Sequence, residues 1–297
     1  MNAPAAAPAQ VAFPRPPSAQ GQLPATTELP HIVEFKNVSK TYSPGTSRAY
    51  TAVKDINFVV HDLPKVGELV AMLGPSGCGK STVLRLIAGL EPQFPPTTGE
   101  ILVQGKPVTG PGADRGMVFQ EYTAFDNRTV LDNVAFGLEC HGVSKKERHE
   151  RAMTWIQKVG LNPQRDALKY PHQLSGGMRQ RVAIARSLIL NPRILLMDEP
   201  FGALDPMTRL RMQDLLIALW SAAEGTVFFV THSIEEAVFL GDRVYLFSTA
   251  PGTIVEEIYS PRPDSSAVVS QNRPDFVERV RYIREKIAKM EEAAGIK

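Results

Sequence analysis

The sequence has few cysteines and no long apolar run, and both absences limit what the protein can be. Only two of its 297 residues are cysteines, Cys78 and Cys140. Cys78 lies in a glycine-rich segment that a disulfide would obstruct, so the sequence favours a reducing compartment such as the cytosol. No apolar stretch approaches the roughly 18 residues that span a bilayer. We therefore expect that the chain does not cross a membrane itself.

Net charge is also nearly absent. The 33 basic side chains are balanced by 31 acidic ones, which gives a formal net charge of +2. Proteins whose main partner is a nucleic acid usually show a strong basic excess. The composition therefore argues against a nucleic acid as partner, whereas the 43% of apolar residues are sufficient for a globular core.

Composition divides the chain into three parts. Residues 1–30 contain seven prolines and eight alanines but few charges, which predicts a disordered tail. Residues 31–262 have the mixed texture of a folded domain. Residues 263–297 form a linker and a helix with one apolar face, made of Phe276, Val280, Ile283, Ile287 and Met290. That face predicts either a tail helix docked on its own domain or a short coiled-coil or partner helix.

The folded part predicts an α/β class. Short β-type runs from residue 31 indicate an N-terminal antiparallel β layer, in which residues 97–108 form a hairpin. A helical pattern over about residues 121–190 indicates an inserted helical subdomain. Strands and helices then alternate, which is typical of a mainly parallel sheet with crossover helices.

A glycine-rich loop, "GPSGCGKST", stands between a predicted strand and a predicted helix. It fits the phosphate-loop pattern G-x-x-x-x-G-K-S/T, whose backbone amides wrap phosphates; the alternative is an ordinary glycine-rich turn. The Lys80 ammonium would reach the β and γ oxygens, and the Ser81 hydroxyl would coordinate Mg²⁺. The predicted core is thus that of a P-loop NTPase, with a nucleotide-binding loop of Gly74, Pro75, Ser76, Gly77, Cys78, Gly79, Lys80, Ser81 and Thr82.

Three polar residues follow predicted buried strands. Asp198 and Glu199 end the strand "RILLMDEP", where the first can hold the Mg²⁺ shell through water and the second can take a proton from an attacking water. His232 follows the next apolar strand and is expected at the same sheet edge, in reach of a γ-phosphate. The alternatives are a strand that ends in a solvated turn and a histidine with a structural role.

The segment "LSGGMRQR" places a serine and two glycines directly before a helix. Such a helix start attracts anions, yet no Lys-Ser/Thr pair follows to grip a phosphate. The segment is either half of a phosphate site or a glycine-rich helix start with no ligand.

Together these residues resemble the ATPase subunit of an ATP-binding cassette (ABC) transporter over about residues 31–260. Tyr42 matches the aromatic that stacks on adenine in that family, although an ordinary exposed strand tyrosine is the alternative. By position, residues 74–81 resemble the Walker A loop, Gln120 the Q-loop, Leu174 to Gln180 the signature, Asp198 and Glu199 the Walker B pair, Leu204 and Asp205 the D-loop, and His232 the switch histidine.

The resemblance implies ATP and Mg²⁺ as cofactors and a head-to-tail dimer, in which the signature of one subunit closes over the ATP of the other. One loop and one signature per chain mean that two chains are needed, and a homodimer is expected. The implied catalytic residues are Glu199, His232, Gln120 and Lys80. The implied Mg²⁺ ligands are Ser81, Gln120 and Asp198, and the implied nucleotide contacts of the closing subunit are Ser175, Gly176, Gly177, Gln180 and Asp205.

The stretches "MDEPFGALDPMTR" and "STAPGTI" are similar to importers of nitrate, sulfonates, taurine and related small solutes. The implied protein is a peripheral Mg²⁺-dependent ATPase at the cytoplasmic face of the cell (inner) membrane, bound to a separate permease and indirectly served by a solute-binding protein. Two departures are the missing Pro-Trp pair after Gln120 and Ser233 in place of an acid.

Two other functions stay open at this point. A soluble ABC-type ATPase of DNA repair or translation should show a second cassette, a long coiled-coil insertion or a basic excess. A P-loop kinase should place phosphate-binding arginines in a lid and has no use for the signature.

Overall fold

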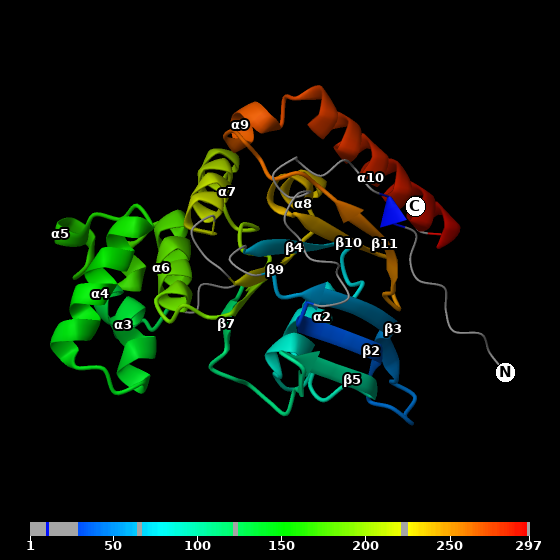
Figure 1. Ribbon diagram of the computed structural model, residues 1–297, viewed down its shortest axis with the longest axis horizontal. Coiled ribbons are helices and arrows are strands. Elements are labelled where there is room, and N and C mark those ends of the chain that lie inside the picture. The colour runs from blue at the N-terminus through cyan, green and yellow to red at the C-terminus, as the bar shows by residue number, and fades with distance from the viewer. Residues whose placement is uncertain (1–9, 12–28, 64–66, 121–123, 221–224, 296–297) are drawn as a thin grey trace. The chain divides into compact units, whose positions relative to one another are not determined.

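The computed structural model describes residues 10–11, 29–63, 67–120, 124–220 and 225–295 (Figure 1). Its contacts form two compact units, one made of residues 1–64, 68–111 and 228–297 and the other of residues 65–67 and 112–227. No helix of the described residues is long and apolar enough to span a bilayer. Most of the tail expected over residues 1–30 lies outside the described residues. Within it, Gln10–Val11 form a two-residue strand, β1.

The first unit contains an antiparallel sheet with the order β3-β2-β5-β6. Its β5–β6 turn places Gln104 and Gly105 at φ values of 51° and 71°, the backbone of the tight turns that match strand twist. The predicted antiparallel layer and its hairpin are therefore confirmed. The strands are β2 (His31–Tyr42), β3 (Tyr50–His61), β5 (Thr98–Val103) and β6 (Lys106–Pro107).

A second, mainly parallel set of strands in this unit has the order β1-β11-β10-β4-β9. β10 pairs parallel with β4 and antiparallel with β11, while β1 pairs parallel with β11. Every residue of β4, β9 and β10 is buried, which explains why the interiors of these strands are apolar and polar residues stand only at their ends. The strands are β4 (Glu68–Leu73), β9 (Thr226–Thr231), β10 (Arg243–Phe247) and β11 (Ile254–Tyr259).

The C-terminal helix of the first unit packs on its neighbour α8, as Figure 1 shows. Phe276, Val280 and Ile283 of the predicted apolar face are buried. An ion pair of 3.0 Å between the Arg284 guanidinium and the Glu235 carboxylate adds to this contact. The helices of this unit are α2 (Lys80–Ala88), α8 (Ile234–Leu240), α9 (Ala267–Ser270) and α10 (Pro274–Ala293).

The second unit combines a parallel strand pair with several helices. β7 (Arg115–Val118) pairs with the fully buried β8 (Ile194–Asp198). The helical pattern expected over residues 121–190 corresponds to several helices of this unit. The domain boundaries that the sequence indicates remain predictions. The helices are α3 (Val130–Cys140), α4 (Lys145–Lys158), α5 (Pro163–Asp166), the 3-10 turn η2 (Pro171–Gln173), α6 (Gly176–Leu188) and α7 (Pro206–Trp220).

Candidate nucleotide-binding site

The glycine-rich loop connects β4 to α2 in the first unit, as the sequence predicts. Gly77 and Gly79 adopt φ values of 75° and 93°, a left-handed conformation that residues with a Cβ rarely take. At Gly74 a Cβ would lie 2.9 Å from the Cβ and the carbonyl oxygen of Phe247. Glycine is therefore required at three places in this loop, for two different reasons.

Lys80 opens α2 and is almost fully buried inside the loop. Its Nζ donates hydrogen bonds to the carbonyl oxygens of Gly74 and Pro75, each at 2.7 Å, and lies 3.6 Å from the Cys78 Sγ. Burial raises the pKa of the Cys78 thiol, although the adjacent ammonium acts in the opposite direction. A raised pKa favours the protonated form of the thiol, which is the less reactive one.

The outer side of the loop is packed against two other segments of the same unit. A Cβ at Gly79 would collide with the Val53 side chain in β3. A Cβ at Gly252 would collide with the Cys78 carbonyl oxygen, and the Gly252 amide also donates to the Ala52 carbonyl at 2.9 Å. The "STAPGTI" segment, which the sequence singled out only as a family likeness, therefore supports the back of the loop.

Tyr42 ends β2 close to the first turn of α2. Its hydroxyl lies 3.3 Å from the Thr82 Oγ1, and the Lys40 ammonium lies 5.6 Å from its ring centroid. The ring thus stands beside the helix that starts from the phosphate loop, which is compatible with the expected stacking on a base.

His232 is exposed directly after β9, at the start of α8. The turn that carries it is fixed on both sides. The Thr231 hydroxyl donates to the buried Glu236 carboxylate at 2.6 Å, and the Ser233 Oγ caps α8 by accepting from the Glu236 amide at 3.2 Å. Ser233, a departure from the family pattern, therefore still acts as a helix cap.

Asp198 and Glu199 leave β8 in the second unit. Asp198 is buried, whereas Glu199 adopts φ 44°, an uncommon value for a residue with a side chain. The Gln120 amide, which follows β7, donates from Nε2 to the Glu199 Oε2 at 3.2 Å. Two residues that the sequence proposed separately are thus brought into contact.

The signature segment starts α6 in the same unit. The Ser175 Oγ accepts from the Met178 amide at 3.4 Å, and the residue is exposed. A Cβ at Gly177 would lie 2.7 Å from the Thr208 Cγ2, so the α6 start packs closely on α7. Gly176 is the first residue of α6, and Gln180 is buried in its second turn. The serine hydroxyl is therefore presented on the surface of the single chain.

Asp205 caps the neighbouring helix, α7. Its Oδ1 accepts from the Thr208 amide at 3.0 Å, and the hydrogen bonds from Thr208 lower the pKa of the Asp205 carboxyl. The expected D-loop aspartate thus has a role at a helix start in addition to the one that the family implies.

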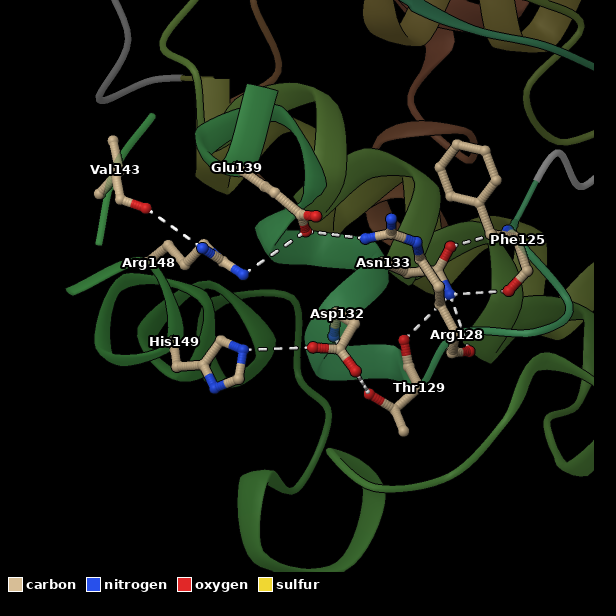
Figure 2. Close-up of polar contacts among 9 residues, drawn as sticks. All are labelled: Phe125, Arg128, Thr129, Asp132, Asn133, Glu139, Val143, Arg148 and His149. Atoms are coloured by element: carbon tan, nitrogen blue, oxygen red, sulfur yellow. Dashed lines mark hydrogen bonds and ion pairs between the residues drawn. The ribbon is translucent and has the colours of Figure 1, made fainter. Parts of the chain in front are cut away.

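The segment after Gln120 is described from residue 124 and is fastened to α3 by a residue that sequence reasoning missed. The buried Asn133 accepts from the Phe125 amide at 2.8 Å and donates to the Phe125 carbonyl at 3.1 Å (Figure 2). Its Nδ2 also lies 3.0 Å from the Arg128 carbonyl and 2.9 Å from that of Thr129. A polar residue on the apolar face of "VLDNVAFGLE" was the signal for it.

Ion pairs surround this fastened segment, as Figure 2 shows. The Arg128 guanidinium donates to the Glu139 carboxylate at 2.8 Å, and Arg148 of α4 approaches the same carboxylate at 3.7 Å. The Asp132 carboxylate lies 3.2 Å from the His149 Nε2. Residues 124–129, which we call the Phe125 loop, are therefore joined to α3, and Glu139 and Asp132 of α3 in turn contact α4.

The side chains implied as Mg²⁺ ligands are all oxygen donors. The described residues contain no cluster of three or more His, Cys, Asp or Glu side chains arranged as metal ligands. Ser81, Gln120 and Asp198 supply a hydroxyl, an amide oxygen and a carboxylate. These are the hard oxygen donors that suit Mg²⁺, which in phosphate sites keeps waters and phosphate oxygens as its remaining ligands. Each of these side chains therefore has the chemistry that Mg²⁺ prefers.

A phosphate loop between a buried parallel strand and a helix defines the P-loop class of nucleoside-triphosphate-binding proteins. The family model described as "ABC transporter" matches residues 53–202. The nitrate import ATP-binding protein NrtD of Synechocystis is 52% identical over 214 residues, which cover 72% of this chain and 77% of that protein. The taurine import ATP-binding protein TauB of Rhizobium johnstonii is 51% identical over 224 residues, covering 75% and 82%.

The dimeric structure of the ATP-binding cassette MJ0796 in a post-hydrolysis state, bound to ADP and Pi, is similar with a TM-score of 0.64 and 36% identity. It covers 76% of this chain and 98% of that one. The chain therefore belongs to the ABC transporter family, and the predicted α/β fold with a P-loop NTPase core is confirmed. These relatives do not favour the soluble DNA-repair or translation ATPase.

Proposed function

We propose that this chain is the ATP-hydrolysing subunit of an ABC importer for a small solute of the nitrate, sulfonate or taurine class. The observation that carries the proposal is the phosphate loop, in which Lys80 is held by two loop carbonyls and is poised to exchange them for phosphate oxygens. The names of the relatives support import and the solute class.

In this proposal ATP and Mg²⁺ bind at the loop. The loop amides and Lys80 hold the β- and γ-phosphates, Tyr42 stacks on the base, and Ser81, Gln120 and Asp198 are the ligands of the ion. Mg²⁺ supplies charge neutralisation on the phosphate oxygens when bound.

Glu199 takes the proton of the attacking water, because a carboxylate fixed by Gln120 needs little reorganisation during the step. His232, on a turn fixed by Thr231 and Ser233, contacts the γ-phosphate and stabilises its developing charge.

Two chains act together in the proposed cycle. Ser175, Gly176, Gly177, Gln180 and Asp205 of one chain face the ATP of the other. The exposed Ser175 at the start of α6 supports this arrangement. A helix N-terminus attracts phosphates, and an exposed one is accessible to the ATP that the other chain holds. ATP closes the pair and hydrolysis reopens it.

The permease docks on the Phe125 loop, and a solute-binding protein delivers the solute to the permease from the other side. The assembly places this chain at the cytoplasmic face of the cell membrane. The exposed Phe125 ring, with the Arg128 and Arg186 guanidinium carbons 5.7 and 5.4 Å from its centroid, offers an apolar contact rimmed by positive charge.

Uptake of labelled nitrate and taurine tests the proposal in cells that lack this chain. Wild type should restore uptake of one of these solutes, whereas Lys80→Ala should not, although the protein is present at the same level. Restoration by the Lys80→Ala variant would separate uptake from ATP binding at this loop and contradict the proposal.

A further inference from the structure

An exposed tyrosine outside the expected site contacts the phosphate loop. Tyr50 begins β3 and is 49% exposed. Its hydroxyl donates a hydrogen bond to the Gly77 carbonyl oxygen at 3.3 Å. The aromatic ring itself is not needed for the core, so this polar contact is the main interaction that the structure gives it.

The position of Tyr50 relative to the loop is fixed by the sheet. Tyr50 is the cross-strand partner of Tyr42, the residue expected to stack on the base. Two and three residues further along β3, Ala52 and Val53 approach Gly79 so closely that a Cβ has no room there. β3 and α2 also lie in contact. The pairing with Tyr42 and the close approach of Ala52 and Val53 to Gly79 therefore fix the backbone of Tyr50 next to the loop.

The hydrogen bond determines which way one peptide of the loop faces. In a trans peptide the C=O and the following N–H point in opposite directions. The Gly77 carbonyl faces Tyr50, and on the other side of the same peptide the Cys78 N–H donates at 3.5 Å to the Pro75 carbonyl, the oxygen to which Lys80 also donates. Because Gly77 has φ 75° and no side chain, the alternative orientation of this peptide has little steric penalty.

We propose that Tyr50 is a positioning residue of the phosphate loop, which holds the Gly77 carbonyl outward so that the Cys78 amide faces the bound phosphates. Backbone amides that converge on one point bind anions only when their peptides share an orientation. The proposal rests on the proposed use of this loop for ATP. Tyr50 acts through Gly77 and touches neither the phosphates nor the reacting atoms.

Equilibrium binding of ADP and of inorganic tripolyphosphate to the purified full chain tests the proposal. Tyr50→Phe keeps the ring and removes the hydroxyl, so both ligands should bind about 5-fold more weakly, the usual effect of losing one hydrogen bond. The melting temperature without ligand should stay within one or two degrees of wild type, since Tyr50 is half exposed. In turnover, KM for ATP should rise while kcat changes little.

Tyr259→Phe is the matched control. The Tyr259 hydroxyl donates to the Glu257 carboxylate at 2.9 Å, and the residue pairs with Arg243 at the end of β10 opposite to the loop. Its binding constants should equal those of wild type. Lys80→Ala should weaken the binding of both ligands strongly. A wild-type affinity in that variant would contradict the proposal that this loop is the nucleotide site.

Two results would overturn the inference. If Tyr50→Phe binds both ligands as wild type does while Lys80→Ala does not, the hydroxyl does not orient the loop. If the variant loses ADP affinity but keeps tripolyphosphate affinity, Tyr50 contacts the base or ribose directly, since tripolyphosphate has neither.

Discussion

The Gln120 side chain donates from Nε2 to the Glu199 Oε2 at 3.2 Å. The two residues follow β7 and β8, parallel neighbours in the second unit, so the ends of these strands bring them together. Glu199 is further constrained by its left-handed backbone at φ 44°. Its own backbone and a neighbouring amide thus both restrict the orientation of this carboxylate. Such a restricted carboxylate is suited to act as a general base, which must accept a proton from a water in one defined position.

Glu199→Gln should bind ATP but hydrolyse it on the order of 100-fold more slowly. The glutamine oxygen can still accept from Gln120, so the geometry persists while the base is lost. Nucleotide affinity and turnover are measured in parallel, with Glu150→Gln on the exposed side of α4 as a control of equal charge change. Wild-type turnover in Glu199→Gln would assign the base to another group.

Mixed dimers assembled on the permease test which chain Ser175 serves. If each ATP lies between the loop of one chain and the signature of the other, a Lys80→Ala chain joined to a Ser175→Arg chain has both lesions in one site. The other site is whole. Joining wild type to a chain with both changes puts one lesion in each site. The first pairing should therefore hydrolyse more ATP than the second.

The reverse ranking would contradict the head-to-tail arrangement, because a Ser175 that serves its own chain leaves an undamaged unit only in the second pairing. Equal, near-zero turnover would mean that both sites are required together. In that case crosslinking of Ser175→Cys to a cysteine in the opposing loop decides the arrangement.

Asn133→Ala should weaken the response to the permease. Without its amide, the Phe125 loop loses the hydrogen bonds that fasten it to α3, and buried backbone groups of the loop lose their partner. The ratio of ATP turnover with permease to turnover without it is expected to fall several-fold. Arg148→Ala, which removes an ion pair with Glu139 but leaves Asn133 in place, should keep the ratio near wild type. A normal ratio in Asn133→Ala would place docking elsewhere.

Asp166 should make the free energy of unfolding depend on pH. Its carboxylate has no exposed surface and contacts Arg165 at 2.9 Å and Lys169 at 2.7 Å, and the Arg165 hydrogen bond is the main cause that holds its pKa below the usual range. A depressed folded-state pKa adds stability above the unfolded-state value, near 4, which is lost as the pH falls. Asp166→Asn should cost about 1–2 kcal/mol at pH 7 and less at pH 3. Denaturant unfolding at both values measures this, and an equal cost would exclude the ionic origin.

Sequence reasoning identified the elements whose signals are local. The loop between β4 and α2 follows from a spacing of glycines and a lysine, and the β5–β6 hairpin follows from a turn of two residues. Sequence reasoning did not identify the roles of Tyr50, Asn133 and Gly252. Each contacts backbone atoms or a segment distant in the chain, and the spacing of residues along the sequence does not show such contacts. Gln120 and Glu199 were predicted only in part. The family pattern predicts both as site residues, whereas their contact is seen only in the structure, where β7 and β8 are paired.

Three carbonyl oxygens of the phosphate loop accept hydrogen bonds from side chains, those of Gly74 and Pro75 from Lys80 and that of Gly77 from Tyr50, and Gly252 lies too close to the Cys78 carbonyl to carry a side chain. Such a loop has little conformational freedom left to lose when a nucleotide arrives, so the entropy of ordering the backbone is a small part of binding. Amide hydrogen exchange at Cys78, whose N–H donates to the Pro75 carbonyl, should then already be slowed before any nucleotide is added. Apart from the Lys80 contacts, which the proposed function exchanges for phosphate oxygens, the loop backbone should then be ordered before a nucleotide binds.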